Sequence, residues 1–273
     1  MASSTRPSSG RPSRSTSGER TTTASSSGPW SSSSRGTTTI SAEAASVGKK
    51  DNLRPARVDK KEVFRLFRGA GPAAQAYLRV KFRICPLLRA EAYVPDRGDL
   101  VDLGCGNGLF PAILKLGAPA RRILGLDLDP RKIAVARQAL AGVPGLDFTL
   151  GDVLAFDYPP ADIYTLIDVL YLLPFEAQDA VLAKCRAALR PGGTLVIKEM
   201  DKKPRWKYLW NSVQETVAVK IIGFTLGRAF HFRGREETLA RLRTLGFEAS
   251  AVRLDRGYGY PHILYLARKD GVK

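Results

Sequence analysis

The fold of this chain is decided by the stretch Asp99-Leu-Val-Asp-Leu-Gly-Cys-Gly-Asn-Gly108, a short apolar run that ends in three alternate glycines. The pattern predicts a strand, a tight turn and the start of a helix. Glycine is needed in such a turn because a Cβ would block positive φ angles and the close approach of a ligand to the backbone. We therefore expect a ligand pocket at the carboxyl end of this strand.

The spacing of the glycines restricts the ligand. A dinucleotide-binding turn reads G-x-G-x-x-G and sets a helix N-terminus under a pyrophosphate, whereas Gly104, Gly106 and Gly108 give G-x-G-x-G. Asp102 lies two residues before the first glycine, where a carboxylate would repel a phosphate and suit a ligand that carries cationic groups. S-adenosylmethionine is a ligand of that kind.

Strand-like and helix-like segments alternate along the chain after the glycine turn. The predicted strands are residues 122–127, 148–150, 162–168 and 194–197, followed by 249–254 and 263–267, and the predicted helices are 109–116, 130–141, 176–190 and 236–245. This alternation predicts a parallel sheet that is covered on both faces and binds ligands at the carboxyl ends of its strands. Asp129 precedes Pro130, and we expect it to cap a helix rather than to form a metal pair with Asp127.

Two further helices are predicted before the first strand. Asp59 caps the first, over residues 59–67. Residues 74–92 also alternate like a strand in part, but we assign them as helix and expect their arginines and lysine to form a solvated face.

From about residue 100 to 268 the order of these landmarks resembles the class I S-adenosylmethionine-dependent methyltransferases. The resemblance implies an α/β fold, a doubly wound Rossmann-like sheet of seven strands that is mostly parallel with an antiparallel last strand. It implies S-adenosylmethionine as cofactor, with the glycine turn at the methionine part, a ribose-binding acid after the second strand and an adenine-binding acid after the third. The cofactor-binding residues would be Asp102, Gly104, Cys105, Gly106, Gly108, Asp127, Leu128, Asp152, Val153 and Asp168.

Methyl transfer depends mainly on holding the acceptor atom in line with the methyl group and the sulfur of the donor. A hydroxyl or acid acceptor would also benefit from a general base, and the candidates near strand ends are Tyr171, Glu199, Asp201, His231 and His262. Spacing fixes none of these as catalytic, and it predicts no metal site. Asp152 is alternatively a simple turn residue.

The sequence differs from the motifs of some methyltransferase subfamilies, and these differences restrict the class of methyl acceptor. The fourth strand ends Asp168-Val-Leu-Tyr171, which differs from the Asn/Asp-Pro-Pro-Tyr run of enzymes that methylate planar nitrogens, and it has no Pro-Cys pair for attack on cytosine. Residues 62–92 and 205–233 mix apolar and basic side chains, which favours a small-molecule or lipid-like acceptor. The alternatives are an RNA methyltransferase and a cofactor-binding interaction protein without catalysis.

The net charge of +17 is the support for the RNA alternative. Residues 1–53 hold seven Lys/Arg and three Asp/Glu, a net charge of +4, and the remaining 36 and 23 give +13. The basic charge therefore belongs mostly to the folded part, where it attracts anionic surfaces without identifying a partner.

The chain divides into a Ser/Thr/Arg-rich tail at 1–48, predicted to be disordered, N-terminal helices at 54–95 that flank the pocket, and a methyltransferase domain at 96–273 with a helical insertion at about 203–233. The insertion has an apolar stripe, which predicts a lid over the acceptor pocket; a core helix and peripheral membrane contact are the alternatives. The stripe is Trp206, Trp210, Val213, Val217, Ile221 and Phe224. Three scattered cysteines favour a reducing compartment, so we expect a cytoplasmic protein; import into an organelle by the tail is the minor alternative.

Overall fold

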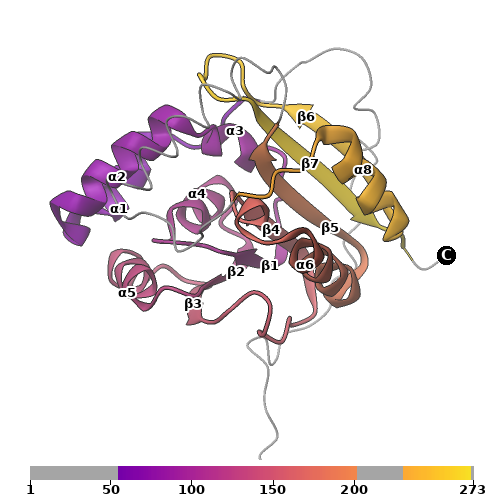
Figure 1. Cartoon of the computed structure of the whole chain (residues 1–273). Coiled ribbons are helices and arrows are strands. Elements are labelled where there is room, and N and C mark those ends of the chain that lie inside the picture. Colours follow the sequence, from indigo (N-terminus) through magenta and orange to yellow (C-terminus); the bar gives the residue numbers. More distant parts are fainter. Residues whose placement is uncertain (1–54, 202–229, 272–273) are drawn as a thin grey trace, which may run out of the picture. The chain divides into compact units, whose positions relative to one another are not determined.

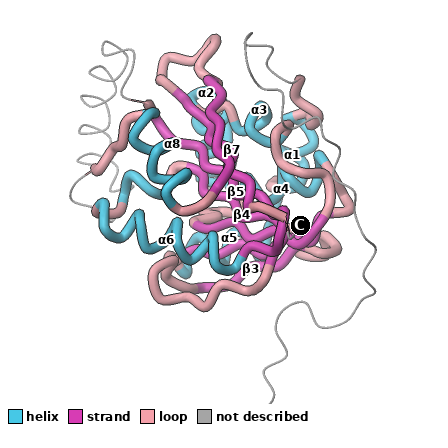
Figure 2. The backbone as a smooth tube through the Cα atoms, turned by 90° about the vertical axis from the view of Figure 1, so that its right-hand side faces the viewer, coloured by secondary structure: helices cyan, strands magenta, loops and turns pink. Residues whose placement is uncertain are grey.

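The computed structural model describes residues 55–201 and 230–271. Within these residues the core is a seven-stranded sheet in the order β3-β2-β1-β4-β5-β7-β6, and Figures 1 and 2 show it as a central layer with helices on both sides. The strands are β1 Gly98–Leu103, β2 Arg121–Asp127, β3 Leu146–Leu150, β4 Ala161–Ile167, β5 Leu189–Met200, β6 Phe247–Arg253 and β7 His262–Lys269. The helices are α1 Lys60–Leu66, α2 Gly71–Ile84, α3 Leu87–Glu91, α4 Leu109–Gly117, α5 Pro130–Ala139, α6 Phe175–Ala188 and α8 Arg235–Thr244.

The strand pairing confirms the predicted doubly wound sheet. β1 pairs in parallel with β2 and β4, β2 with β3, and β4 with β5, whereas β7 runs antiparallel to both β5 and β6. The chain changes direction of winding between β1 and β4, which is the switch point at which such sheets bind ligands. The central strands are apolar because helices cover both of their faces: Leu100, Val101 and Leu103 of β1 are fully buried.

The helices form two groups. α4 contacts both α1 and α3 on one side of the sheet, whereas α6 packs on β5 and α8 on β6. Successive residues of a strand point to opposite faces, so neighbours on β5 serve different groups of helices. Lys198 lies near Cys85, just after α2, and Glu199 faces a pocket beside α6 and α8.

Local sequence signals were mostly reliable. Asp59 accepts a hydrogen bond from the Lys61 N–H, and Asp129 accepts one from the Arg131 N–H, so both predicted N-caps are confirmed. The single helix predicted over 74–92 was wrong in one respect: α2 ends at Ile84 and α3 begins at Leu87, because Pro86 disfavours helical backbone at Cys85.

Two other predicted boundaries were wrong. α6 ends at Ala188, and β5 begins at Leu189 rather than Thr194, because Leu189 already pairs with Ala161 and the register shifts before Thr194 pairs with Ile163. The tail at 1–48 and the lid predicted for the stripe at 205–228 lie outside the described residues. Residues 230–233, the end of the predicted insertion, are irregular rather than helical. None of the described helices is long and apolar enough to cross a membrane.

Candidate functional site

The glycine turn joins β1 to α4 in a conformation that side chains disfavour. Gly104, Gly106 and Gly108 have φ angles of +77°, +56° and +78°. A Cβ on Gly104 would lie 2.5 Å from Val169 Cγ2, whereas a Cβ on Gly106 would meet no atom within 4 Å. The N–H groups of Gly104 and Cys105 donate to the Leu126 carbonyl at 2.7 and 2.8 Å. The turn is thus fixed to β2 and leaves open space beside Gly106.

Asp127, the last residue of β2, lies directly against this turn. Its Oδ2 accepts the Gly106 N–H at 2.8 Å and its Oδ1 accepts the Asp129 N–H at 2.9 Å. An ionised carboxylate offers about four lone-pair positions, so two remain for the hydroxyls of a ligand. The sequence therefore predicted the place of Asp127 correctly, and the structure adds that it also orients the glycine turn.

Apolar surface is exposed beside Asp127. Leu128 is 58% exposed, and Leu150 and Leu154, at and after the end of β3, are 52% and 40% exposed. Asp152 is also exposed, and its Oδ1 accepts the Leu154 N–H at 2.9 Å, so it has the turn role that the sequence left open. The adjacent Val153 carbonyl accepts the Tyr158 hydroxyl at 2.8 Å.

Asp102, on β1, is buried under the glycine turn. The Thr165 hydroxyl donates to its Oδ1 at 2.5 Å, and burial raises the pKa of Asp102 to about 7. A nearby cation would favour the ionised form. A ligand with hydroxyls, an apolar ring and cationic groups, as S-adenosylmethionine has, therefore fits the residues present: Asp127, the exposed leucines and Asp102, around open space at Gly106.

Asp168 follows β4 and is the only described residue other than glycine with a positive φ, +59°. Its carboxylate forms ion pairs with Lys81 of α2, at 3.0 Å, and with Lys198 of β5. Burial alone would raise the pKa of Asp168, but Lys198 and Lys81 outweigh it and lower that pKa. Burial in turn lowers the pKa of each lysine, but the neighbouring groups, Asp168 foremost among them, together raise the pKa of both. All three groups are therefore charged.

The sequence analysis missed both lysines. Lys81 was predicted to belong to a solvated face, which was wrong: its side chain is 25% exposed and contacts a residue 87 positions away. Lys198 had a signal that could have been used, because it follows the apolar run Leu195-Val-Ile within a predicted buried strand. A charged residue in such a strand needs a partner.

His262 begins β7 on the same side of the sheet as Lys198. Its Nε2 lies 2.7 Å from the Ile84 carbonyl, so the proton is placed on Nε2, and Nδ1 has no hydrogen-bond partner among the described residues. Burial, together with the charge of Lys198, lowers the pKa of His262 to about 3. The imidazole is therefore a neutral, weak base.

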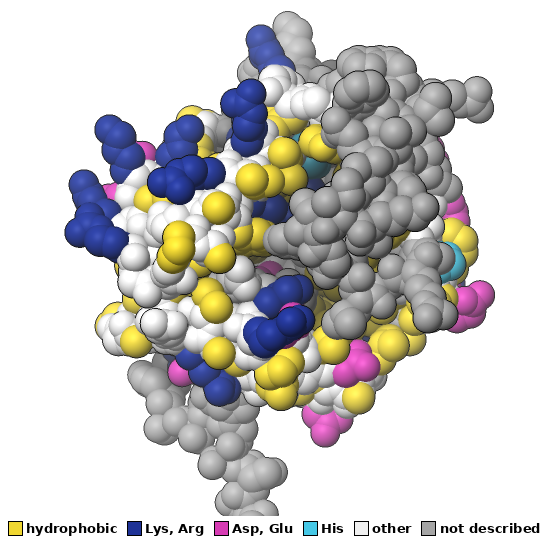
Figure 3. Space-filling model, turned by 60° about the vertical axis from the view of Figure 1, so that its left-hand side comes forward, with side chains coloured by type: hydrophobic (Ala, Val, Ile, Leu, Met, Phe, Trp, Pro, Cys, Tyr) yellow, Lys and Arg dark blue, Asp and Glu magenta, His cyan; other side chains and the backbone are white. Residues whose placement is uncertain are grey.

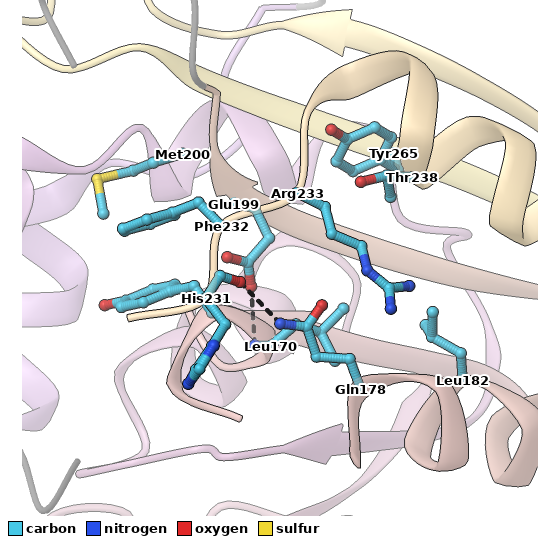
Figure 4. Close-up of a pocket in the computed structure, with 11 residues that line it drawn as sticks. Leu170, Gln178, Leu182, Glu199, Met200, His231, Phe232, Arg233, Thr238 and Tyr265 are labelled. Carbon is cyan, nitrogen blue, oxygen red and sulfur yellow. Dashed lines mark hydrogen bonds between the residues drawn. The ribbon is translucent and has the colours of Figure 1, made fainter. Parts of the chain in front are cut away.

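The other candidate bases lie elsewhere. Tyr171, Glu199 and His231 line one pocket between β5, α6 and α8, together with Gln178 and Phe232 (Figure 4). Glu199 accepts the N–H groups of Val169 and Leu170 at 3.2 and 2.9 Å, and burial, with Asp168, raises its pKa to about 8.

The remaining contacts in this pocket are structural. Gln178 donates to the His231 carbonyl at 2.8 Å, and the Tyr171 and Phe232 rings stack with centroids 4.9 Å apart. The Asp201 N–H donates to the Pro261 carbonyl. No glycine of the turn lines this pocket. The open space at Gly106 and the carboxylate of Asp127 both lie at the glycine turn, so we place the ligand site there. Cys105 is buried there, and burial raises the pKa of its thiol, so it contributes through its backbone.

Comparison with known proteins agrees with a site for S-adenosylmethionine in the central part of the chain. Residues 100–193 match the model of a methyltransferase domain. The carboxy-S-adenosyl-L-methionine synthase of Chromohalobacter salexigens is 37% identical over 117 residues, which is 41% of this chain and 43% of that protein. The malonyl-[acyl-carrier protein] O-methyltransferase of Methylococcus capsulatus is 26% identical over 180 residues, 64% of this chain and 61% of that protein.

A solved structure shows the same fold. The O-methyltransferase family 2 protein of Planctomyces limnophilus, in complex with apigenin, superimposes with a TM-score of 0.55 at 18% identity, covering 78% of this chain and 63% of that one. The chain spans less than two thirds of the length of these proteins. The domain match, the strand order and the G-x-G-x-G turn agree: this chain carries a methyltransferase domain of the class I S-adenosylmethionine-dependent family.

Proposed function

We propose that the protein transfers a methyl group from S-adenosylmethionine to a small-molecule or lipid-like acceptor. The observation that carries the proposal is the pairing of Asp127 with the open glycine turn at the switch point of the sheet. Two of the similar proteins are named as O-methyltransferases, one of them for a malonyl-[acyl-carrier protein], which supports acceptors of this class.

The residues would divide the work as follows. The turn at Gly106 admits the cofactor, Asp127 accepts from the ribose hydroxyls, and Leu128 covers one face of the adenine. Asp102 faces the cationic methionine end, where ionisation strengthens the contact. S-adenosylmethionine supplies a methyl group on a positively charged sulfur, which is a good leaving group. The task of the protein is then to hold the acceptor in line with that methyl group.

Calorimetric titration with S-adenosylhomocysteine tests the cofactor site. Asp127→Asn should weaken binding by about 1–3 kcal/mol, because a charge-assisted pair of hydrogen bonds is lost. Asp147→Asn makes the same charge change at an exposed position of β3 and should bind like the wild type. Equal affinity in Asp127→Asn and the wild type would remove Asp127 from the site.

The acceptor class needs an activity assay. Cell extract is incubated with the enzyme and methyl-labelled S-adenosylmethionine, and the label is followed in the small-molecule, lipid and RNA fractions. Label in the first two supports the proposal. Label in RNA alone would replace it with the alternative that the basic charge suggests, and no transfer with normal cofactor binding would indicate a non-catalytic protein.

A further inference from the structure

Among the residues that the structure describes, the ion pairs around Asp168 leave one positive charge without a counter-charge. Two charged lysines, Lys81 and Lys198, share this one carboxylate. The side chains of Lys198 and Asp168 are 1% and 12% exposed, so little solvent screens this ion pair. Lys81, 25% exposed, is the member that reaches the surface.

The neighbouring groups do not supply the missing negative charge. The Cys85 thiol, 3.5 Å from Asp168 Oδ2, stays protonated because burial raises its pKa. Glu199, with its pKa raised to about 8, is mostly protonated at neutral pH. His262 is neutral, and its buried Nδ1 is a second group without a partner among the described residues. Within residues 55–201 and 230–271, the cluster therefore lacks one negative charge and one hydrogen-bond donor.

The cluster adjoins the cofactor site. Asp168 immediately precedes Val169, whose Cγ2 fills the position that a Cβ on Gly104 would take. Asp168, to which Lys81 binds, is thus one residue from a contact with the glycine turn. Figure 3 shows the face that carries α1 and α2, with Lys and Arg side chains gathered around hydrophobic ones. Such a surface suits a molecule with an apolar body and an anionic end.

We propose that Lys81 and Lys198 bind a carboxylate of the methyl acceptor, so that the substrate class is a carboxylic acid with an apolar body. This inference rests on the proposed function and deepens it. A singly charged carboxylate neutralises the cluster, whereas a phosphate dianion would leave it with a negative charge. The donor that His262 Nδ1 lacks is then a hydroxyl of the acid or a water that it retains.

The test uses pairs of probes that differ in charge and little in shape: acetate with acetamide, and benzoate with benzamide. Thermal unfolding of the full chain is followed while each probe is added at constant ionic strength, with and without saturating S-adenosylhomocysteine. We expect the acids to raise the melting temperature in the presence of S-adenosylhomocysteine and the amides to have no effect. Lys81→Met should weaken the apparent affinity for the acids roughly tenfold to hundredfold.

Two controls separate the site from general attraction to a basic protein. Arg83→Met removes one charge from an exposed position of the same helix and should bind the acids like the wild type, and Lys81→Arg should retain most of the affinity. Equal effects of acids and amides, or an acid effect that survives in Lys81→Met, would overturn the proposal. If Lys81→Met does not fold, the comparison of acid with amide in the wild type decides alone.

The two conditions also separate this proposal from the proposed function. An acid effect that disappears when S-adenosylhomocysteine is bound would assign the cluster to the carboxylate of the cofactor and overturn the proposal. Absence of S-adenosylhomocysteine binding would instead count against the proposed function. Normal S-adenosylhomocysteine binding with no response to acids would refute only the carboxylate site.

Discussion

Two clusters in this protein each place two cations around one largely buried carboxylate, at opposite ends of the strands. The Arg121 cluster, which consists of Arg57, Glu91, Asp96 and Arg121, lies where β2 begins. Arg121 and Arg57 contact Glu91 Oε1 at 2.9 and 2.8 Å, and the second carboxylate, Asp96, pairs with Arg57. Arg121 also donates to the carbonyls of Val94, Pro95 and Leu114. Charges and donors are thus matched.

The Lys81 cluster, which consists of Lys81, Asp168 and Lys198, lies where the strands end and lacks such a match. No second carboxylate contacts it among the described residues, and the nearby His262 Nδ1 has no partner there. Burying a charge without its partner is costly, so an incomplete cluster is retained only where something else completes it. The comparison therefore indicates that the Arg121 cluster stabilises the fold, whereas the Lys81 cluster is completed by a ligand, as we propose.

The largest expected effect comes from breaking the complete cluster. Arg121→Met should lower the free energy of unfolding by about 3–5 kcal/mol, because it takes one of two cationic partners from the buried Glu91 and one donor from each of three carbonyls. Urea unfolding measures the loss. Arg243→Met, at an exposed position of α8, should cost less than about 1 kcal/mol. Similar losses in the two variants would show that the Arg121 cluster is not a main source of stability.

An intermediate effect is expected from the carboxyl group beside the incomplete cluster. The pKa of Glu199 is raised in the folded protein from 4.5 to about 8, so the folded state holds a proton that the unfolded state releases. The stability from this proton is complete below pH 4.5 and is lost as the pH rises to about 8. The slope is at most about 1.4 kcal/mol per pH unit.

Glu199→Gln keeps an acceptor for the Val169 and Leu170 N–H groups and removes the titration. Unfolding free energies of the wild type and the variant, measured across this range, should therefore diverge as the pH rises, with the wild type falling. Parallel curves would mean that Glu199 is ionised at neutral pH. The Lys81 cluster would then already have the negative charge that we assign to a ligand.

The smallest effect is expected from removing the surplus cation. Lys81→Met should change the free energy of unfolding by less than about 1 kcal/mol, because Lys198 still neutralises Asp168. The same urea titration measures it. A loss as large as that of Arg121→Met would indicate that both lysines are needed for the fold, and the contrast between the two clusters would no longer hold.

Much of the fold and half of the site could be predicted because their signals are local. Strand and helix periods, the caps at Asp59 and Asp129 and the glycine turn each depend on residues within one turn or strand. Asp127 follows from the same logic, since the carboxyl ends of parallel strands share one edge. The helix break at Cys85 was missed because a single proline, Pro86, overrode the helical period of the apolar residues. The early start of β5 was missed because it depends on pairing with β4 across the sheet.

The sequence by itself determined the doubly wound sheet, the glycine turn and the place of Asp102 and Asp127, because apolar periodicity and turn chemistry are written in consecutive residues. Only the tertiary structure decided which charges meet. Asp168 is 87 residues from Lys81 and 30 from Lys198, and His262 reaches back 178 residues to Ile84. No local pattern specifies such contacts. They exist because the folded sheet brings the end of β4, the end of β5 and the start of β7 under α2. Burial there raises the free-energy cost of each charge that has no partner.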